Sequence, residues 1–350
     1  TICKASETNP RNSEASIVQL RDGRLLLAWQ RYEASGRGSE DNAPSTISMM
    51  DSADGGRSWG NFRKTVPMTE GWVNVYSPNF LRLKDGGIAL FFMRYMQLEA
   101  GKPSLTNAYV IRSYDEGDSW SEETALWERS FYTFSNDCIL RLSGGRLVFP
   151  LCYNDTPVWS GEKESISVTT MVSDDDGVTW KYSDQRITLP MRGAMEPFCA
   201  ECSDGSLFMV MRNQLGSLFK SYSYDGGMSW TKPQTTGLSI PESCPYVTEI
   251  PGTGKHLVVW NHSEYDMHFF SHYGKRTPLT VALTADNGRT FTHLYDIESD
   301  PAWGFSNPGI TWVGRRCYMA YWAVPYSPEG SLGGLIDLKL AAFDVDVEGI

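Results

Sequence analysis

The sequence predicts an all-β protein, a six-bladed β-propeller with four antiparallel strands in each blade. Two interleaved repeats carry this prediction. The first is an octapeptide of the pattern S/T-x-D-x-G-x-S/T-W/F, which occurs five times in 350 residues, at 52–59, 113–120, 173–180, 223–230 and 284–291. Successive copies start 61, 60, 50 and 61 residues apart. A period of this size is typical of propeller blades or solenoid repeats.

The second repeat is a strand–turn–strand unit that alternates with the octapeptide. It occurs six times, at 13–29, 77–92, 135–150, 196–211, 243–260 and 306–322. Turns such as RDGR, KDGG and SDGS supply the Gly and Asp that tight hairpins require. We expect a third strand to lead into each octapeptide and a fourth strand to follow it, which makes each unit a propeller blade.

The octapeptide itself reads as a structural turn. Its Asp can accept backbone N–H groups, its Gly can adopt a positive φ, and its aromatic residue can pack between strands. Asp225 of SYDGGMSW is therefore predicted to be structural. The sixth unit lacks an octapeptide, and we expect residues 335–346 to close the ring with the first residues, so that 1–350 form one domain. Segment 121–130 is the best candidate for a short helix.

Composition narrows the classes of partner. A hydrophobic content of 41% allows a large core, and a net charge of −11 disfavours nucleic acid and anionic membranes as partners. No run reaches the roughly 18 apolar residues of a transmembrane helix. The first residues contain no signal-peptide apolar region. We expect a soluble protein, secreted or periplasmic if a leader has been removed and cytoplasmic otherwise, with its oligomeric state left open.

The seven cysteines lie mostly in strand-like runs, so we expect buried free thiols. Cys199 and Cys202 have C-x-x-C spacing but sit in an alternating strand. No second pair and no His pair completes a zinc ligand set. The sequence therefore predicts no metal site, no redox site and no cofactor.

Candidate site residues stand where each inner strand begins, since these points converge on the centre of a propeller. A purely structural strand would be apolar there, but polar residues recur. The residues at these positions are Arg11, Glu14, Tyr76, Asn79, Asn136, Asp137, Glu196, Glu242, Phe305 and Asn307. We expect this set, and in particular Glu14, Asp137 and Phe305, to lie against a bound substrate.

The octapeptides resemble the Asp-box, or BNR repeat, of the sialidase superfamily, and the resemblance covers essentially the whole chain. It implies a sialidase-like propeller that acts on a sialylated or other acidic glycan. Sialidases hold the substrate carboxylate with three arginines, because a guanidinium fork matches a carboxylate. Arg11, Arg212 at the end of an apolar strand, and Arg276 in the R-x-x-L-T-V pattern are similar to these three.

The resemblance also implies catalytic roles. Glu196 is similar to the glutamate that activates the nucleophile. Asp41, in the loop after the first hairpin, is the closest match to the general acid, with Glu40 and Glu33 as competitors. Sialidases use a tyrosine nucleophile near the last inner strand, before a Ser. Phe305 stands at that position and cannot act as a nucleophile.

Three explanations of this mismatch stay open. Another phenol reaches the site, with Tyr246, Tyr265 and Tyr273 as candidates. Alternatively, Glu196 or Glu242 activates a water molecule and the enzyme inverts, or the chain has lost hydrolysis and kept binding. His262, in a segment that also holds His268 and His272, is a candidate base because histidine titrates near neutral pH.

Three functions follow from these residues. The first is an exo-acting glycoside hydrolase that releases a terminal carboxylate-bearing sugar, most simply sialic acid. The second is a related hydrolase or lyase for uronic acid or arabinose glycans, with Glu196 and Glu242 as its carboxylate pair. The third is a non-catalytic glycan- or protein-binding propeller. Trp72, Trp159 and Trp303, near the expected pocket rim, suit sugar stacking in all three.

Overall fold

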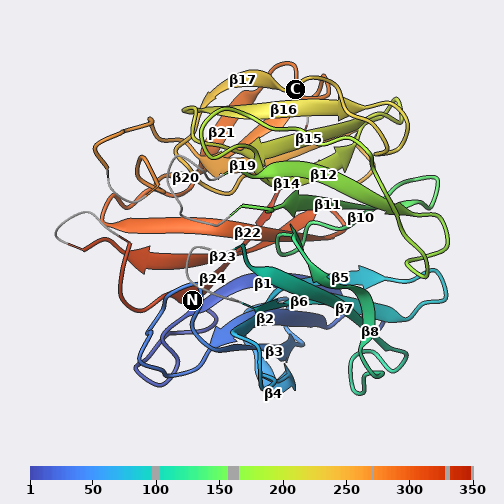
Figure 1. The fold of residues 1–350 in the computed structure, drawn as a ribbon, viewed down its shortest axis with the longest axis vertical. Helices are drawn as coiled ribbons and strands as arrows, with labels where there is room; N and C mark the ends of the chain where they lie inside the picture. The colour runs from blue at the N-terminus through green and yellow to red at the C-terminus, as the bar shows by residue number, and fades with distance from the viewer. Residues whose placement is uncertain (97–102, 157–164, 270–271, 328–331, 348–350) are drawn as a thin grey trace.

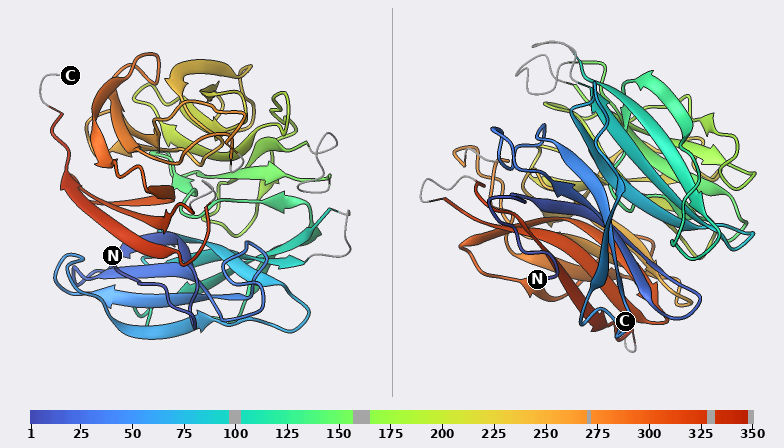
Figure 2. Two further views of the ribbon diagram at one scale, coloured as in Figure 1. Left: turned by 90° about the vertical axis from the view of Figure 1, so that its left-hand side faces the viewer. Right: turned by 90° about the horizontal axis from the view of Figure 1, so that it is seen from below.

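Six antiparallel sheets follow one another around a ring in the computed structural model, which describes residues 1–96, 103–156, 165–269, 272–327 and 332–347 (Figure 1). In the left view of Figure 2 the chain runs from the blue first blade through green and yellow, and returns to it through the red last blade. The predicted six-bladed propeller is confirmed.

The blades are consecutive in the chain, and each sheet begins with its inner strand. Blade 1 holds β1 (Asn12–Gln19), β2 (Leu25–Tyr32), β3 (Ser45–Ser52) and β4 (Gly60–Val66). Blade 2 holds β5 (Asn74–Arg82), β6 (Ile88–Met96), β7 (Leu105–Ser113) and β8 (Thr124–Ser130). Blade 3 holds β9 (Tyr132–Thr133), β10 (Leu140–Arg141), β11 (Leu147–Tyr153), β12 (Ser167–Ser173) and β13 (Lys181–Tyr182).

The second half of the ring follows the same plan. Blade 4 holds β14 (Met195–Glu201), β15 (Leu207–Arg212), β16 (Ser217–Ser223) and β17 (Gln234–Ser239). Blade 5 holds β18 (Tyr246–Ile250), β19 (Lys255–Asn261), β20 (Leu279–Thr284) and β21 (Thr292–Glu298). Blade 6 holds β22 (Trp303–Val313), β23 (Arg316–Pro325) and β24 (Asp337–Asp344).

The N-terminal residues lie beside β24 of blade 6. Cys3 and Leu338 exchange two backbone hydrogen bonds, of 3.2 and 2.9 Å. A second bridge joins Arg11 to Ile336. In the other blades a fourth strand pairs with the third strand. In blade 6 the N-terminal residues lie beside the third strand, β24, instead. That residues 1–350 form one domain stays a prediction.

One expected element is wrong. Segment 121–130 contains the strand β8 rather than a short helix. Its residues pair antiparallel with β7, and Trp127 is buried against the blade with its indole Nε1 donating to Thr106 Oγ1 at 3.1 Å. The ladder with β7 supplies hydrogen bonds that a short isolated helix would lack, and tertiary pairing overrides the local helix propensity.

The octapeptides connect the third and fourth strands of blades 1 to 5, as predicted. In the copy at 223–230, Asp225 Oδ1 accepts the backbone N–H groups of Met228 and Ser229 at 3.0 and 2.8 Å. Trp230 donates its indole N–H to Thr170 Oγ1 of blade 3 at 3.1 Å. The octapeptide thus stabilises its own turn and also joins two neighbouring blades.

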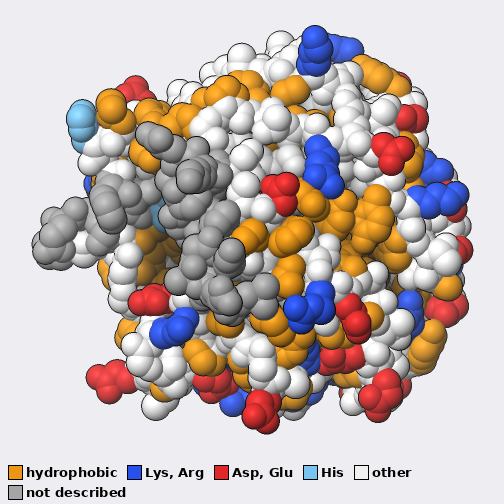
Figure 3. All heavy atoms as spheres, in the orientation of Figure 1, with side chains coloured by type: hydrophobic (Ala, Val, Ile, Leu, Met, Phe, Trp, Pro, Cys, Tyr) orange, Lys and Arg blue, Asp and Glu red, His pale blue; other side chains and the backbone are white. Residues whose placement is uncertain are grey.

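All seven cysteines are buried free thiols. Burial raises the pKa of Cys199, and it raises that of Cys202 to about 11. Within the described ranges no cluster of His, Cys, Asp or Glu is suited to a metal ion, and no helix is long and apolar enough to cross a bilayer. On the face drawn in Figure 3, acidic and basic side chains are interspersed.

Candidate active site

A shared backbone distortion places polar side chains around the ring axis. Near the start of five inner strands, one non-glycine residue has a φ between 43° and 56°: Glu14, Ser77, Asp137, Glu196 and Asn307. Four of the strands show a shift in pairing register at this point. Such bulges bend a strand and turn a side chain toward a new direction, and left-handed non-glycine residues are typical of functional sites.

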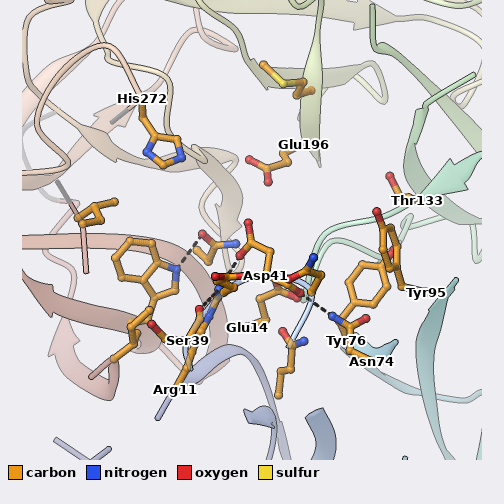
Figure 4. Close-up of a pocket in the computed structure, with 18 of the residues that line it drawn as sticks. Arg11, Glu14, Ser39, Asp41, Asn74, Tyr76, Tyr95, Thr133, Glu196 and His272 are labelled. Carbon is orange, nitrogen blue, oxygen red and sulfur yellow. Dashed lines mark hydrogen bonds and ion pairs between the residues drawn. The ribbon is translucent and has the colours of Figure 1, made fainter. Parts of the chain in front are cut away.

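Nine of the site residues predicted from the sequence line one cavity of about 830 Å³ at this end of the ring, part of which Figure 4 draws. They are Arg11, Glu14, Glu40, Asp41, Tyr76, Glu196, Arg212, Arg276 and Asn307. Glu14 and Asp41 come from blade 1, whereas Glu196 and Arg212 come from blade 4. These blades lie opposite each other in a ring of six, so Glu14 and Asp41 face Glu196 across the cavity.

Behind this lining, Glu242 holds two arginines. Its Oε1 accepts from Arg192 Nη1 at 2.5 Å and from Arg212 Nη2 at 2.9 Å, while Oε2 accepts from Gln214 at 2.9 Å. Burial raises the pKa of Glu242, but Arg212 and Arg192 outweigh it and keep the pKa below its ordinary value. Only 1% of the surface of Glu242 is exposed, so the prediction that Glu242 is a catalytic residue is corrected by the structure. It positions the cations instead.

Arg276 differs from the other three arginines of the cavity lining because no carboxylate pairs with it among the described residues. Its Nη2 donates to the backbone oxygen of Glu242 at 3.1 Å, and its guanidinium lies 5.5 Å from the ring centre of Trp322. Nε has no partner in the described part of the chain. Burial and then Arg212 lower its pKa to about 10, so it is still a cation at neutral pH. A charge of this kind suits an anionic ligand.

Arg11 is paired with the candidate acid. Its Nη1 donates to Asp41 Oδ1 at 2.5 Å and to the backbone oxygen of Ser39 at 3.2 Å. The protein that surrounds the open cavity raises the pKa of Asp41, although its side chain stays in contact with solvent, but the charge of Arg11 and its hydrogen bond outweigh this and lower the pKa. Asp41 is thus held as a carboxylate in the structure.

Glu14 lies beside this pair, and its pKa is shifted in the opposite direction to that of Asp41. Its Oε2 accepts the backbone N–H and the Oγ–H of Ser77, both at 3.0 Å. Burial raises the pKa of Glu14 to about 6, and Arg11 offsets only part of this rise. Glu14 is therefore a carboxyl group that can exchange a proton at mildly acidic pH.

Asp137, which was expected to bind substrate, and Tyr246, a candidate nucleophile, form a separate cluster, and their expected places are corrected. The hydroxyl of Tyr246 donates to Asp137 Oδ2 at 2.9 Å, and Ser16 Oγ and Ile310 N also donate to this carboxyl, both at 2.6 Å. Asp137 and Tyr246 line a smaller cavity of about 200 Å³, not the larger one. The left-handed backbone at Asp137, with a φ of 53°, turns its side chain toward the contact of the inner strands.

Phe305 is packed in the core, with 1% of its surface exposed and its ring against Tyr321. Two residues further along the bulged β22, Asn307 lines the cavity instead. Trp303 also packs against the core and does not appear in the cavity lining. The expected contacts of Phe305 and Trp303 with substrate are therefore corrected, because β22 turns both rings toward the core.

The aromatic candidates of the fifth blade, His262, Tyr265 and Tyr273, also lie outside the cavity lining. His262 packs against Trp260, outside the lining, whereas His272 of the same segment reaches the cavity. Burial, followed by the nearby arginines, lowers the pKa of His272 well below its ordinary value. Tyr265 and Tyr273 stack on each other outside the lining. Trp72 also lies outside it, and Trp159 falls beyond the described residues.

Sequence reasoning missed several lining residues. Arg192, Tyr32, Tyr95, His272 and Trp322 contact the cavity without having been assigned to it. Arg192 had a usable signal, because it lies four residues before Glu196 on the path into the same inner strand. Tyr32 and Tyr95 sit at or near the ends of second strands, where the repeat pattern carries no polar signal.

Fold and cavity together define a class: a sialidase-like β-propeller with an arginine-rich cavity on the ring axis. The chain belongs to the BNR repeat-like domain family, whose pattern matches residues 23–317. A sialidase of Micromonospora viridifaciens is 27% identical over 245 residues, and a sialidase of Bacteroides fragilis is 26% identical over 209. These matches cover 63% and 56% of this chain but only 36% of either sialidase.

Solved structures share the fold at lower identity. A protein of unknown function from Dyadobacter fermentans has a TM-score of 0.75 at 19% identity, with 99% of this chain and 98% of that chain covered. An intramolecular trans-sialidase from Ruminococcus gnavus, in complex with oseltamivir carboxylate, has a TM-score of 0.73 at 14% identity, with 99% and 97% covered. The Hadza microbial sialidase Hz136 has a TM-score of 0.70 at 18% identity, with 96% and 66% covered.

Proposed function

We propose that the protein is an exo-acting glycoside hydrolase that releases a terminal carboxylate-bearing sugar, most simply sialic acid. The observation that carries the proposal is Arg276, a buried cation without a carboxylate partner in the described chain, in a cavity that Arg11 and Arg212 also line. A sugar carboxylate would supply the missing negative charge and match the guanidinium fork. The sialidase relatives and the carboxylate ligand of one structural neighbour support this substrate class.

Two carboxylates on opposite sides of the cavity supply the acid and the base. Asp41 of blade 1 would give its proton to the glycosidic oxygen as the bond to the anomeric carbon breaks. Glu196 of blade 4 would take a proton from a water molecule as the water oxygen bonds to that carbon. Arg212 Nη1 donates to Glu196 Oε2 at 2.8 Å and fixes the orientation of this base.

A water nucleophile fits the cavity better than a phenol. In retaining sialidases a tyrosine attacks, and its oxygen must be activated by a carboxylate. Tyr32, Tyr76 and Tyr95 line the cavity, but no hydrogen bond joins any of them to a carboxylate within the described ranges. Burial raises the pKa of Tyr76 well above its ordinary value, which opposes phenolate formation. Direct attack by water inverts the anomeric carbon.

Phe305 favours a second candidate, a propeller that binds acidic glycans without cleaving them. The pairing of Glu196 with Glu242 in a uronic acid or arabinose enzyme has less support, because Glu242 is held by two arginines behind the cavity. Fluorogenic sialosides, uronides and arabinosides separate these functions. Turnover of the sialoside alone is expected, turnover of another substrate would redirect the proposal, and binding of sialic acid without turnover would favour the second candidate.

A further inference from the structure

The ion pair between Arg11 and Asp41 joins a fixed cation to an exposed anion. Arg11 is anchored by Nε, which donates to Ser13 Oγ at 3.0 Å, and by the ring of Tyr32, whose centre lies 4.7 Å from Cζ. The Arg11 side chain is 10% exposed, whereas the Asp41 side chain is 79% exposed. Asp41 comes from the connection between β2 and β3, and its backbone oxygen accepts from Asn74 Nδ2 of β5 at 2.6 Å. Its carboxyl group is hydrogen-bonded to Arg11 alone among the described residues, so the side chain can leave Arg11 while the backbone stays in place.

Two carboxyl groups, those of Asp41 and Glu14, act on Arg11. Glu14 lies beside the pair, and the negative charge of Asp41 contributes to the raised pKa of Glu14, after burial as the main cause. A sugar carboxylate that binds Arg11 would therefore meet Asp41 at the same guanidinium. Like charges at one site disfavour the doubly occupied state, so the two carboxylates compete.

We propose that Asp41 is a built-in substitute for the substrate carboxylate, which occupies Arg11 in the empty protein and is displaced when an acidic sugar binds. This inference rests on the proposed function and adds a coupling between recognition and acid catalysis. An acidic sugar removes Asp41 from its cation, and the freed carboxyl group then holds a proton more readily. A neutral sugar leaves Asp41 paired with Arg11 and leaves the acid disabled.

The exchange is tested by binding rather than by turnover. Calorimetric titration with the didehydro-deoxy analogue of N-acetylneuraminic acid compares the wild-type protein with Asp41→Asn. Because the variant removes the competing charge, we expect about fivefold tighter binding of this carboxylate ligand. The methyl ester of the same ligand carries no charge to exchange, and its affinity should be equal in the two proteins.

Glu40→Gln is the matched control, since Glu40 is the neighbouring acidic residue in the cavity lining and no ion pair of Glu40 with Arg11 occurs in the described structure. It removes the same charge from the same loop, so a gain seen in both variants would be a general electrostatic effect and would overturn the exchange. Equal or weaker binding to Asp41→Asn would also overturn it. If the wild-type protein and both variants fail to bind the carboxylate ligand, the proposed function fails as well, which is a distinguishable result.

Discussion

Arg212 lies between two carboxylates, with Nη2 2.9 Å from Glu242 Oε1 and Nη1 2.8 Å from Glu196 Oε2. One arginine therefore links the buried support of the site to the group that we assign as base. Glu242 contacts Arg192 as well, so a single buried carboxylate fixes two cations of the cavity. The order of the site depends on a residue that does not itself line the cavity.

Replacing Glu242 should destabilise the fold as well as the site. Glu242→Ala leaves Arg192 and Arg212 without their shared buried anion, and removing one partner of a buried pair costs about 3–5 kcal/mol. Urea unfolding measures the loss. Glu249→Ala, a partly exposed change in β18, should cost about 1 kcal/mol or less. Equal losses of unfolding free energy in the two variants would show that the ion pairs of Glu242 do not stabilise the fold.

Arg276 should determine affinity for the carboxylate with little effect on folding. Arg276→Ala removes the one cavity-lining guanidinium without a carboxylate partner in the described residues, and we expect kcat/KM on a sialoside to fall about 100-fold or more. Arg276→Lys keeps the charge but not the planar fork, so only part of the activity should return. Unfolding midpoints close to the wild-type value serve as the folding control, and an unchanged rate would contradict the assigned role.

The sequence predicted the ring and half of the site because the spacing of the repeats shows where each residue lies within a blade. Spacing identifies each blade, and each blade has one inner strand whose first residues must face the axis. Arg11, Glu14 and Glu196 follow from this rule, and all three line the cavity. Arg212 ends the second strand of blade 4, opposite Met195 of the inner strand, and was predicted from its resemblance to a sialidase arginine. Asp41, in the loop after the first hairpin, was predicted from its resemblance to the general acid of sialidases and not from the repeats.

The rest of the site depends on bulges that the sequence does not mark. A register shift in β22 lies between Ser306 and Gly309, and it decides that Asn307 rather than Phe305 faces the cavity. Strict alternation cannot predict such a change of face. The segment at 261–276 has no strand period at all, and for this reason His262 could not be distinguished from His272.

Hydrolysis should invert the anomeric carbon. Proton NMR of the first product from an α-sialoside should show the β-anomer before mutarotation, because a water molecule attacks from the side of Glu196. Glu196→Gln should lose about 100-fold or more in kcat, since general base catalysis contributes at this scale. An α-anomer as first product would instead require a covalent intermediate and an unrecognised nucleophile in the cavity.

Glu14 should make stability depend on pH in a direction opposite to that of most carboxylates. Its pKa in the folded protein is raised from 4.5 to about 6. Its protonated form is therefore favoured by folding, so its contribution is complete below pH 4.5 and is lost as the pH rises through 6. The full loss amounts to about 2 kcal/mol. Glu14→Gln removes this titration while keeping the size of the side chain.

The measurement is urea unfolding of the wild-type protein and Glu14→Gln across this pH range. The stability of the variant relative to the wild type should rise by about 2 kcal/mol between pH 4.5 and 7. A difference between Glu14→Gln and the wild type that stays constant with pH would mean that Glu14 remains a carboxylate throughout, and the Ser77 hydrogen bonds would then dominate over burial.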